Sequence, residues 1–140
     1  MDKKIVIISV LLTAIVLIYG VFWFNKKQNQ DFVILSDSQI EQLAENTILY
    51  YGDGCPACAQ LEEIIKERDI RNQISIIEKE IYKNKNNSSE LMSVSQYCGI
   101  DPAVVGIPFL FDEGECFVGV PDVLARLDLK ISKTEEIILE

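Results

Sequence analysis

A continuous apolar segment lies near the start of the chain. Residues 5–24 carry no charge, and Ser9 and Thr13 are their only aliphatic hydroxyl side chains. As a helix, this segment would extend about 30 Å, which matches the hydrocarbon core of a bilayer. Lysines flank it on both sides, and aromatic residues gather at its C-terminal end, as they do at membrane interfaces. We therefore expect a single-pass membrane anchor at residues 5–24, preceded by a tail at residues 1–4.

The alternatives to an anchor are a cleaved signal peptide and a buried core helix. The apolar region of a signal peptide is about 7–15 residues long and ends in small side chains. Here the segment is longer and ends in Val21-Phe22-Trp23-Phe24. The flanking lysines barely decide orientation, but the short N-terminal tail favours a signal-anchor with the rest of the chain outside the cytoplasm. Residues 25–36 are polar at first and are expected to form a linker to a domain at residues 37–140.

Beyond the linker, the hydrophobic pattern alternates between strand and helix periods. A helix separates the first two predicted strands, so these strands are expected to be parallel, whereas the turn-forming segment 112–115 predicts an antiparallel hairpin. The resulting order, β-α-β-α-β-β-α, indicates an α/β domain with a mixed four-stranded sheet. The predicted strands are 47–51, 74–77, 109–111 and 116–118, and the predicted helices begin near residues 37, 56, 87 and 121.

Composition and charge remove several classes of function. The 140 residues include 22 acids against 13 bases, for a net charge of −9, together with four cysteines and no histidine. Such an acid excess argues against a nucleic-acid binder, which needs a basic face. The lack of histidine removes the Ser-His-Asp and Cys-His mechanisms and most zinc sites. Cysteine is therefore the main chemical resource of the chain.

Cys55 and Cys58 form a Cys-x-x-Cys motif at a predicted strand-to-helix junction. Pro56 suits the first position of the helix, which places Cys55 where the helix dipole favours a thiolate. Cys58 follows one turn later and is close enough to form a disulfide with Cys55. The pattern predicts thiol–disulfide exchange, with Cys55 as the nucleophile and Cys58 as the resolving thiol. Inert buried cysteines and half of a zinc site remain alternatives, but the chain has no second close cysteine pair.

The block Tyr50-Tyr51-Gly52-Asp53-Gly54-Cys55-Pro56-Ala57-Cys58, with Gly106-Ile107-Pro108 further on, resembles the thioredoxin/glutaredoxin superfamily. The resemblance implies a thioredoxin-like fold in which Pro108 is a cis proline that faces the two cysteines. It also implies that Ile107 offers backbone groups to an extended substrate, beside Pro56 and Ala57. The expected partners are protein thiols and disulfides, and a membrane redox partner. No metal is expected, nor any cofactor besides the redox-active Cys55–Cys58 pair.

Two departures from the family patterns bear on which branch of this superfamily the chain resembles. Glutaredoxins carry a glutathione-binding turn before their last helix, and here only Gly119 and Asp122 match it, while Val118 and Pro121 differ. This argues against glutathione binding. Leu49 stands where thioredoxins carry a buried aspartate.

The second pair of cysteines and the overall function retain alternatives. Cys98 and Cys116 could form a structural disulfide, stay as buried thiols or have a redox role of their own, because sequence alone does not give the distance between them. For the whole chain, the alternatives to an oxidoreductase are a Cu(I) chaperone of the same fold that binds through Cys55 and Cys58, or a non-catalytic binding module.

Overall fold

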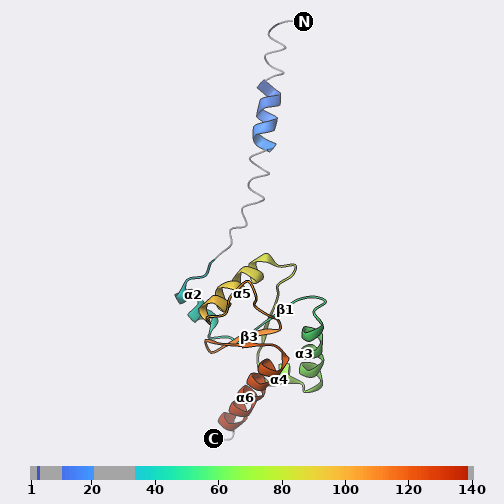
Figure 1. Ribbon diagram of the computed structural model, residues 1–140, viewed down its shortest axis with the longest axis vertical. Coiled ribbons are helices and arrows are strands. Elements are labelled where there is room, and N and C mark those ends of the chain that lie inside the picture. The colour runs from blue at the N-terminus through green and yellow to red at the C-terminus, as the bar shows by residue number, and fades with distance from the viewer. Residues whose placement is uncertain (1–2, 4–10, 21–33, 139–140) are drawn as a thin grey trace. The chain divides into compact units, whose positions relative to one another are not determined.

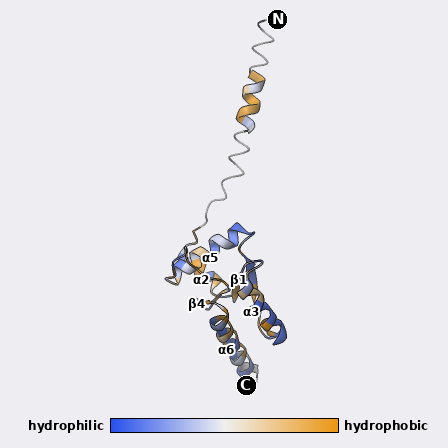
Figure 2. Ribbon diagram, turned by 45° about the vertical axis from the view of Figure 1, so that its right-hand side comes forward, coloured by the Kyte–Doolittle hydropathy of each residue, from blue (hydrophilic) through white to orange (hydrophobic). Residues whose placement is uncertain are grey.

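The computed structural model describes residue 3, residues 11–20 and residues 34–138 (Figure 1). The chain divides into two compact units, Met1–Phe32 and Val33–Glu140. In the first unit, residues 11–20 are helical and largely apolar (Figure 2). The other residues of the predicted anchor, 5–10 and 21–24, lie outside the described residues, as does the predicted linker up to residue 33. Within the described ranges, no helix has the length and apolarity that a membrane crossing requires.

The second unit contains a four-stranded sheet with the strand order β2-β1-β3-β4. The β1 strand pairs in parallel with β2 and antiparallel with β3, and β3 and β4 form an antiparallel hairpin. The predicted mixed four-stranded sheet, with its parallel first pair and its final hairpin, is confirmed. The elements are α2 (Asp37–Leu43), β1 (Ile48–Tyr51), α3 (Pro56–Glu67), α4 (Ile70–Gln73), β2 (Ile77–Glu80), α5 (Lys85–Tyr97), β3 (Phe109–Asp112), β4 (Glu115–Val118) and α6 (Val120–Ile138).

The two central strands separate two hydrophobic cores. Successive side chains of a strand point to opposite faces. Leu49 of β1 and Leu110 of β3 therefore pack on one face with buried residues of α3, α4 and α6. On the other face, Tyr50 of β1 and Phe109 of β3 pack with buried residues of α2 and α5. Helices thus cover both faces of the sheet (Figure 1).

The second strand begins later than predicted. The apolar run Ile74–Ile77 was expected to form it, but β2 starts at Ile77 and continues through charged residues. Ile74 is instead buried in the core on the α3 side, together with Ile70 of the unpredicted short helix α4. The prediction was wrong because β2 is an edge strand, paired on one side only, and needs few apolar residues.

The helix α5 begins earlier than predicted. Residues 84–89 were expected to form a loop, with Asn87 and Glu90 as a capping box, but the helix starts at Lys85. The side chain of Asn84 accepts hydrogen bonds from the backbone N–H groups of Asn86 and Asn87. Asn84 is therefore the N-cap that begins the helix.

The domain also begins before residue 37. The Leu35 backbone N–H donates to the Ser93 hydroxyl at 3.2 Å, and the Leu35 side chain packs against the core on the α5 side. Residues 34–36, which were assigned to the linker, therefore belong to the domain.

A buried ionic cluster joins the β3–β4 hairpin to α6. The fully buried carboxylate of Asp112 accepts hydrogen bonds from the Thr47 hydroxyl at 2.6 Å, Arg126 Nε at 2.6 Å and Lys130 Nζ at 2.7 Å. Burial alone would raise the pKa of Asp112, but the three hydrogen bonds and the charge of Lys130 outweigh it, so the pKa is lowered. The cluster thus keeps a carboxylate ionised inside the protein.

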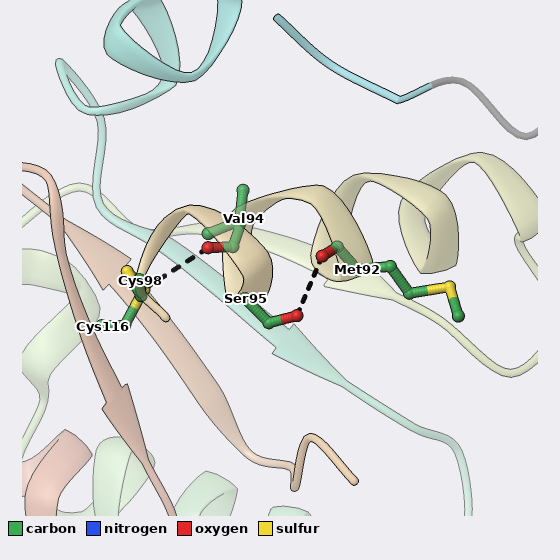
Figure 3. Close-up of a disulfide and its surroundings, with 5 residues drawn as sticks. All are labelled: Met92, Val94, Ser95, Cys98 and Cys116. Atoms are coloured by element: carbon green, nitrogen blue, oxygen red, sulfur yellow. Dashed lines mark hydrogen bonds between the residues drawn. A yellow bond between two sulfur atoms is a disulfide. The ribbon is translucent and has the colours of Figure 1, made fainter. Parts of the chain in front are cut away.

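A disulfide joins Cys98, at the end of α5, to Cys116 in β4 (Figure 3). The Cα atoms are 6.2 Å apart, within the range that a disulfide requires. Both cysteines are half-buried, and Cys116 Sγ lies 3.9 Å from the Val94 carbonyl oxygen. The bond fixes the C-terminal end of α5 to an edge strand of the sheet.

Replacing the buried aspartate should destabilise the domain. We expect Asp112→Asn to lower the free energy of unfolding by about 3 kcal/mol at pH 7, because Arg126 and Lys130 lose their buried carboxylate partner and keep only the more exposed Glu113 in common. The pKa of Asp112 is lower in the folded than in the unfolded protein. Its contribution to stability is therefore fully present above the unfolded pKa of about 3.9, and it is lost as the pH falls from there through the folded pKa. Urea unfolding between pH 2 and pH 7 measures both effects.

The matched control for this variant is Asp128→Asn. Asp128 forms an exposed ion pair with Arg68, and both side chains are 52% exposed. This substitution should cost less than about 1 kcal/mol, because water already screens an exposed pair. Equal losses in the two variants would contradict the role given to burial.

Removing the disulfide should destabilise the domain by a similar amount. The double substitution Cys98→Ser and Cys116→Ser should lower the free energy of unfolding by about 3 kcal/mol. The reason is that the disulfide joins positions 18 residues apart and so restricts the unfolded chain. Excess dithiothreitol should bring the wild-type protein down to the stability of the variant and leave the variant unchanged. Equal stability of the two proteins in non-reducing buffer would contradict this expectation.

Candidate functional site

Cys55 lies at the junction between β1 and α3. The chain leaves β1 through Gly52, Asp53 and Gly54, and the backbone N–H of Cys55 donates to the Gly52 carbonyl at 3.1 Å. Gly54 has φ of 79°, in the left-handed region that favours glycine. Cys55 is the N-cap of α3 and Pro56 occupies its first turn, as the sequence predicted.

Two donors converge on the sulfur of Cys55. The backbone N–H of Cys58 donates to Cys55 Sγ at 3.2 Å, and the Cys58 thiol donates to the same sulfur at 2.6 Å. Both cysteines are free thiols; Cys55 is partly exposed, whereas Cys58 is only 8% exposed. Cys55 Sγ is therefore the acceptor in both contacts, and Cys58 supplies both donors.

Cys58 is held in its protonated form. Burial, followed by the hydrogen bond to Cys55, raises the pKa of Cys58 to about 11. At neutral pH this thiol is therefore a proton donor rather than a nucleophile. The geometry gives the two sulfurs different roles, with Cys55 facing solvent and Cys58 behind it.

The segment before β3 faces the cysteines. The Ile107–Pro108 peptide bond is cis, and Cys55 Sγ lies 4.0 Å from the Ile107 carbonyl oxygen. The Pro108 carbonyl accepts a hydrogen bond from the Gly119 N–H at 2.8 Å, which ties this segment to the start of α6. A cis proline opposite a cysteine pair, on a mixed four-stranded sheet, is the arrangement that the sequence resemblance implies. The domain has a thioredoxin-like fold.

Comparisons with known proteins add one structural likeness. The sequence matches no protein-family profile and no curated protein. A solved structure, that of a buckwheat glutaredoxin–glutathione complex, is similar with a TM-score of 0.48 and 15% sequence identity, over 69% of this chain and 84% of that chain. At this level the likeness does not extend to substrate or partner.

A hollow of about 300 Å³ opens beside the cysteine pair of the thioredoxin-like domain. Pro108 and Leu49 form part of its wall. The other predicted substrate-binding residues do not line it: Pro56 is exposed, and Ala57 and Ile107 are half-buried. The remaining lining residues are Tyr51, Gly52, Asp53, Gly54, Cys55, Cys58, Ala59, Leu61, Glu62 and Glu78.

Several of these lining residues were not predicted from the sequence. Tyr51 ends β1 and, unlike the fully buried Tyr50, is half-exposed and lines the hollow. Glu78 comes from a different strand and reaches the hollow because the parallel register pairs it with Leu49. No local motif marks such a residue, since the strand register alone brings it there.

Tyr82 supports the turn before Cys55. A Cβ atom placed on Gly52 would collide with the Tyr82 ring, so the ring packs directly on the Gly52 backbone. Tyr82 remains 61% exposed on its other side. In the part of the chain that the structure describes, no three cysteine or acidic side chains gather in a way that could hold a metal ion.

The ionisation of Cys58 can be tested separately from that of Cys55. In a Cys55→Ser variant, the pKa of Cys58 should stay above the ordinary value of a thiol, because burial is the largest cause of its raised pKa and persists in the variant. A pH titration of the variant in the ultraviolet measures this value. Ionisation of Cys58 near the ordinary value of about 8.5 would contradict the assigned asymmetry.

Proposed function

We propose that the protein is a thiol–disulfide oxidoreductase that exchanges disulfides with protein thiols through Cys55 and Cys58. The observation that carries the proposal is the asymmetry of the pair. Cys55 is partly exposed at the N-terminus of a helix and receives two hydrogen bonds, while Cys58 is buried and protonated behind it. Such a pair suits attack by one sulfur and resolution by the other.

The proposed exchange proceeds in two steps. The Cys55 thiolate attacks one sulfur of a substrate disulfide, so a mixed disulfide forms and the first substrate thiolate leaves and takes up a proton. Cys58 then loses its proton and attacks Cys55 Sγ, which forms the Cys55–Cys58 disulfide and releases the second substrate thiol. Two electrons pass from the protein dithiol to the substrate disulfide, and the reverse sequence oxidises a substrate dithiol.

The immediate surroundings of the pair support both steps. The Cys58 thiol already lies 2.6 Å from Cys55 Sγ, so resolution needs little movement. Pro108 and the Ile107 carbonyl lie opposite, where an extended substrate segment would approach the exposed sulfur. Leu49 itself supplies no proton acceptor, so the proton of the second step leaves through water, through a carboxylate of the hollow or through the departing substrate thiolate.

We further propose that residues 5–24 anchor the protein in a membrane, with the catalytic domain outside the cytoplasm. The uncharged segment and its flanking lysines and aromatic residues support the anchor. The Cys98–Cys116 disulfide supports the location, because structural disulfides persist mainly in oxidising compartments. A membrane anchor would hold the domain beside a membrane redox partner.

Substitutions of the two cysteines should have different effects. Cys55→Ser should abolish disulfide exchange, at least about a thousandfold below the wild type, because no other exposed sulfur remains as a nucleophile in the domain. Cys58→Ala should retain the first step and accumulate a mixed disulfide with the substrate, because nothing resolves it. Reduction of a peptide disulfide and mass spectrometry of the trapped adduct measure the two outcomes.

The double variant Cys98→Ser and Cys116→Ser provides the matched control. It removes two sulfurs, one more than either single variant, yet it should keep the exchange activity under conditions where it remains folded. Wild-type activity in Cys55→Ser would overturn the proposal. Tight copper binding without any trapped disulfide in Cys58→Ala would favour a metal chaperone instead.

A further inference from the structure

We propose that the hollow beside Cys55 selects substrates whose cysteine is flanked by basic residues, and that it disfavours anionic disulfides such as glutathione disulfide. The proposed substrate class is a cationic segment of a polypeptide. This inference rests on the proposed exchange reaction, because it concerns the substrate of the same sulfur.

Three carboxylates from three different elements line the hollow. Asp53 belongs to the turn before Cys55, Glu62 to α3 and Glu78 to β2. Glu80, at the end of β2, stands close behind them, where it accepts a hydrogen bond from the Asp53 backbone N–H at 3.3 Å. The acidic wall is thus a property of the folded domain rather than of one segment.

The cations that contact this wall neutralise only part of it. Lys83 pairs with Asp53, and Arg71 pairs with both Glu62 and Glu78. Among the described residues, Lys83 and Arg71 are the cations that form ion pairs with Asp53, Glu62, Glu78 or Glu80. An excess of two negative charges therefore remains around the approach to Cys55.

Tyr51 lies within the same negative field. Partial desolvation, followed by the charges of Asp53 and Glu78, raises the pKa of Tyr51 above its ordinary value. The facing segment offers no compensation, since residues 101–108 include Asp101 and no basic residue. The negative charge of the wall is therefore not offset by a basic residue of the facing segment.

The same surroundings offer further contacts for a cationic side chain. Tyr51 lines the hollow, and Tyr82 exposes 61% of its surface beside Gly52. A lysine or arginine next to the reacting cysteine could interact with an aromatic face as well as with the carboxylates. Glutathione carries two carboxylates and one ammonium group for each cysteine, so its net charge is repelled by the wall.

Three synthetic peptide disulfides that differ only in their flanking residues test the inference. The full-length protein, prepared as the dithiol, is mixed with disulfides of peptides that carry lysine, glutamine or glutamate on either side of the cysteine. In single-turnover reactions at low ionic strength, the lysine peptide should react about tenfold faster than the glutamate peptide. The ratio should fall below about twofold in ~0.5 M NaCl, because salt screens exposed charges.

Two substitutions at one ion pair should shift this ratio in opposite directions. Asp53→Asn should lower the lysine-to-glutamate rate ratio about threefold, because it removes one negative charge from the wall. Lys83→Gln should raise the ratio by a similar factor, because it removes a neutralising charge. Both side chains are exposed, at 49% and 75%, so neither change should disturb the fold.

Glu41→Gln is the matched control, since it changes the net charge by one at an exposed position of α2, outside the hollow. The control should leave the ratio unchanged. Equal rates for the lysine and glutamate peptides, or an equal shift in Glu41→Gln and Asp53→Asn, would overturn the inference. If the inference fails but the glutamine peptide still reacts, the proposed function remains supported. If no peptide reacts, the inference and the proposed function are both overturned.

Discussion

The burial of both faces of the central strands is the constraint on which the rest of the domain depends. All four residues of β3 are buried, as are three of the four residues of β1. Because helices cover both faces of β1, the chain continues past the end of the strand before it turns, and it turns sharply there to begin the next helix. Gly52, Asp53 and Gly54 make that turn, and Cys55 then begins α3. The position of Cys55 at a helix N-terminus therefore follows from the way the sheet is covered.

The disulfide and the hydrogen bonds of the hairpin position the opposite side of the site. Cys98 and Cys116 close a loop that contains Ile107, Pro108 and the whole of β3. Within that loop, the Pro108 carbonyl is held by the Gly119 N–H. The segment that faces Cys55 is thus fixed by a covalent cross-link and by the sheet, although it has no regular structure of its own. The cross-link also restricts the unfolded chain, which stabilises the folded arrangement of this loop.

Sequence alone predicted the parts of the site that rest on local rules. Cys55 and Cys58 were found because their spacing, the glycine turn and Pro56 all belong to one segment. The start of β2 was predicted wrongly because Ile74, in the apolar run before the strand, packs in the core beside α4. Tertiary packing decides whether such a residue belongs to a strand or only to the core. Glu78 could not be placed in the hollow, because its pairing with Leu49 is a matter of strand register. Pairing of Cys98 with Cys116 required a Cα separation, which only the structure supplies.

The distribution of cations explains why the hollow stays acidic. The sheet has a charged cluster at each end, since Asp112 lies by the start of β1 and the hollow lies by its other end. Asp112 is fully buried, so an unpaired charge there would be very costly, and Arg126 and Lys130 both bind it. Carboxylates around the hollow are exposed to water and tolerate incomplete pairing. The hollow therefore keeps carboxylates that are only partly paired with Arg71 and Lys83, next to Cys55.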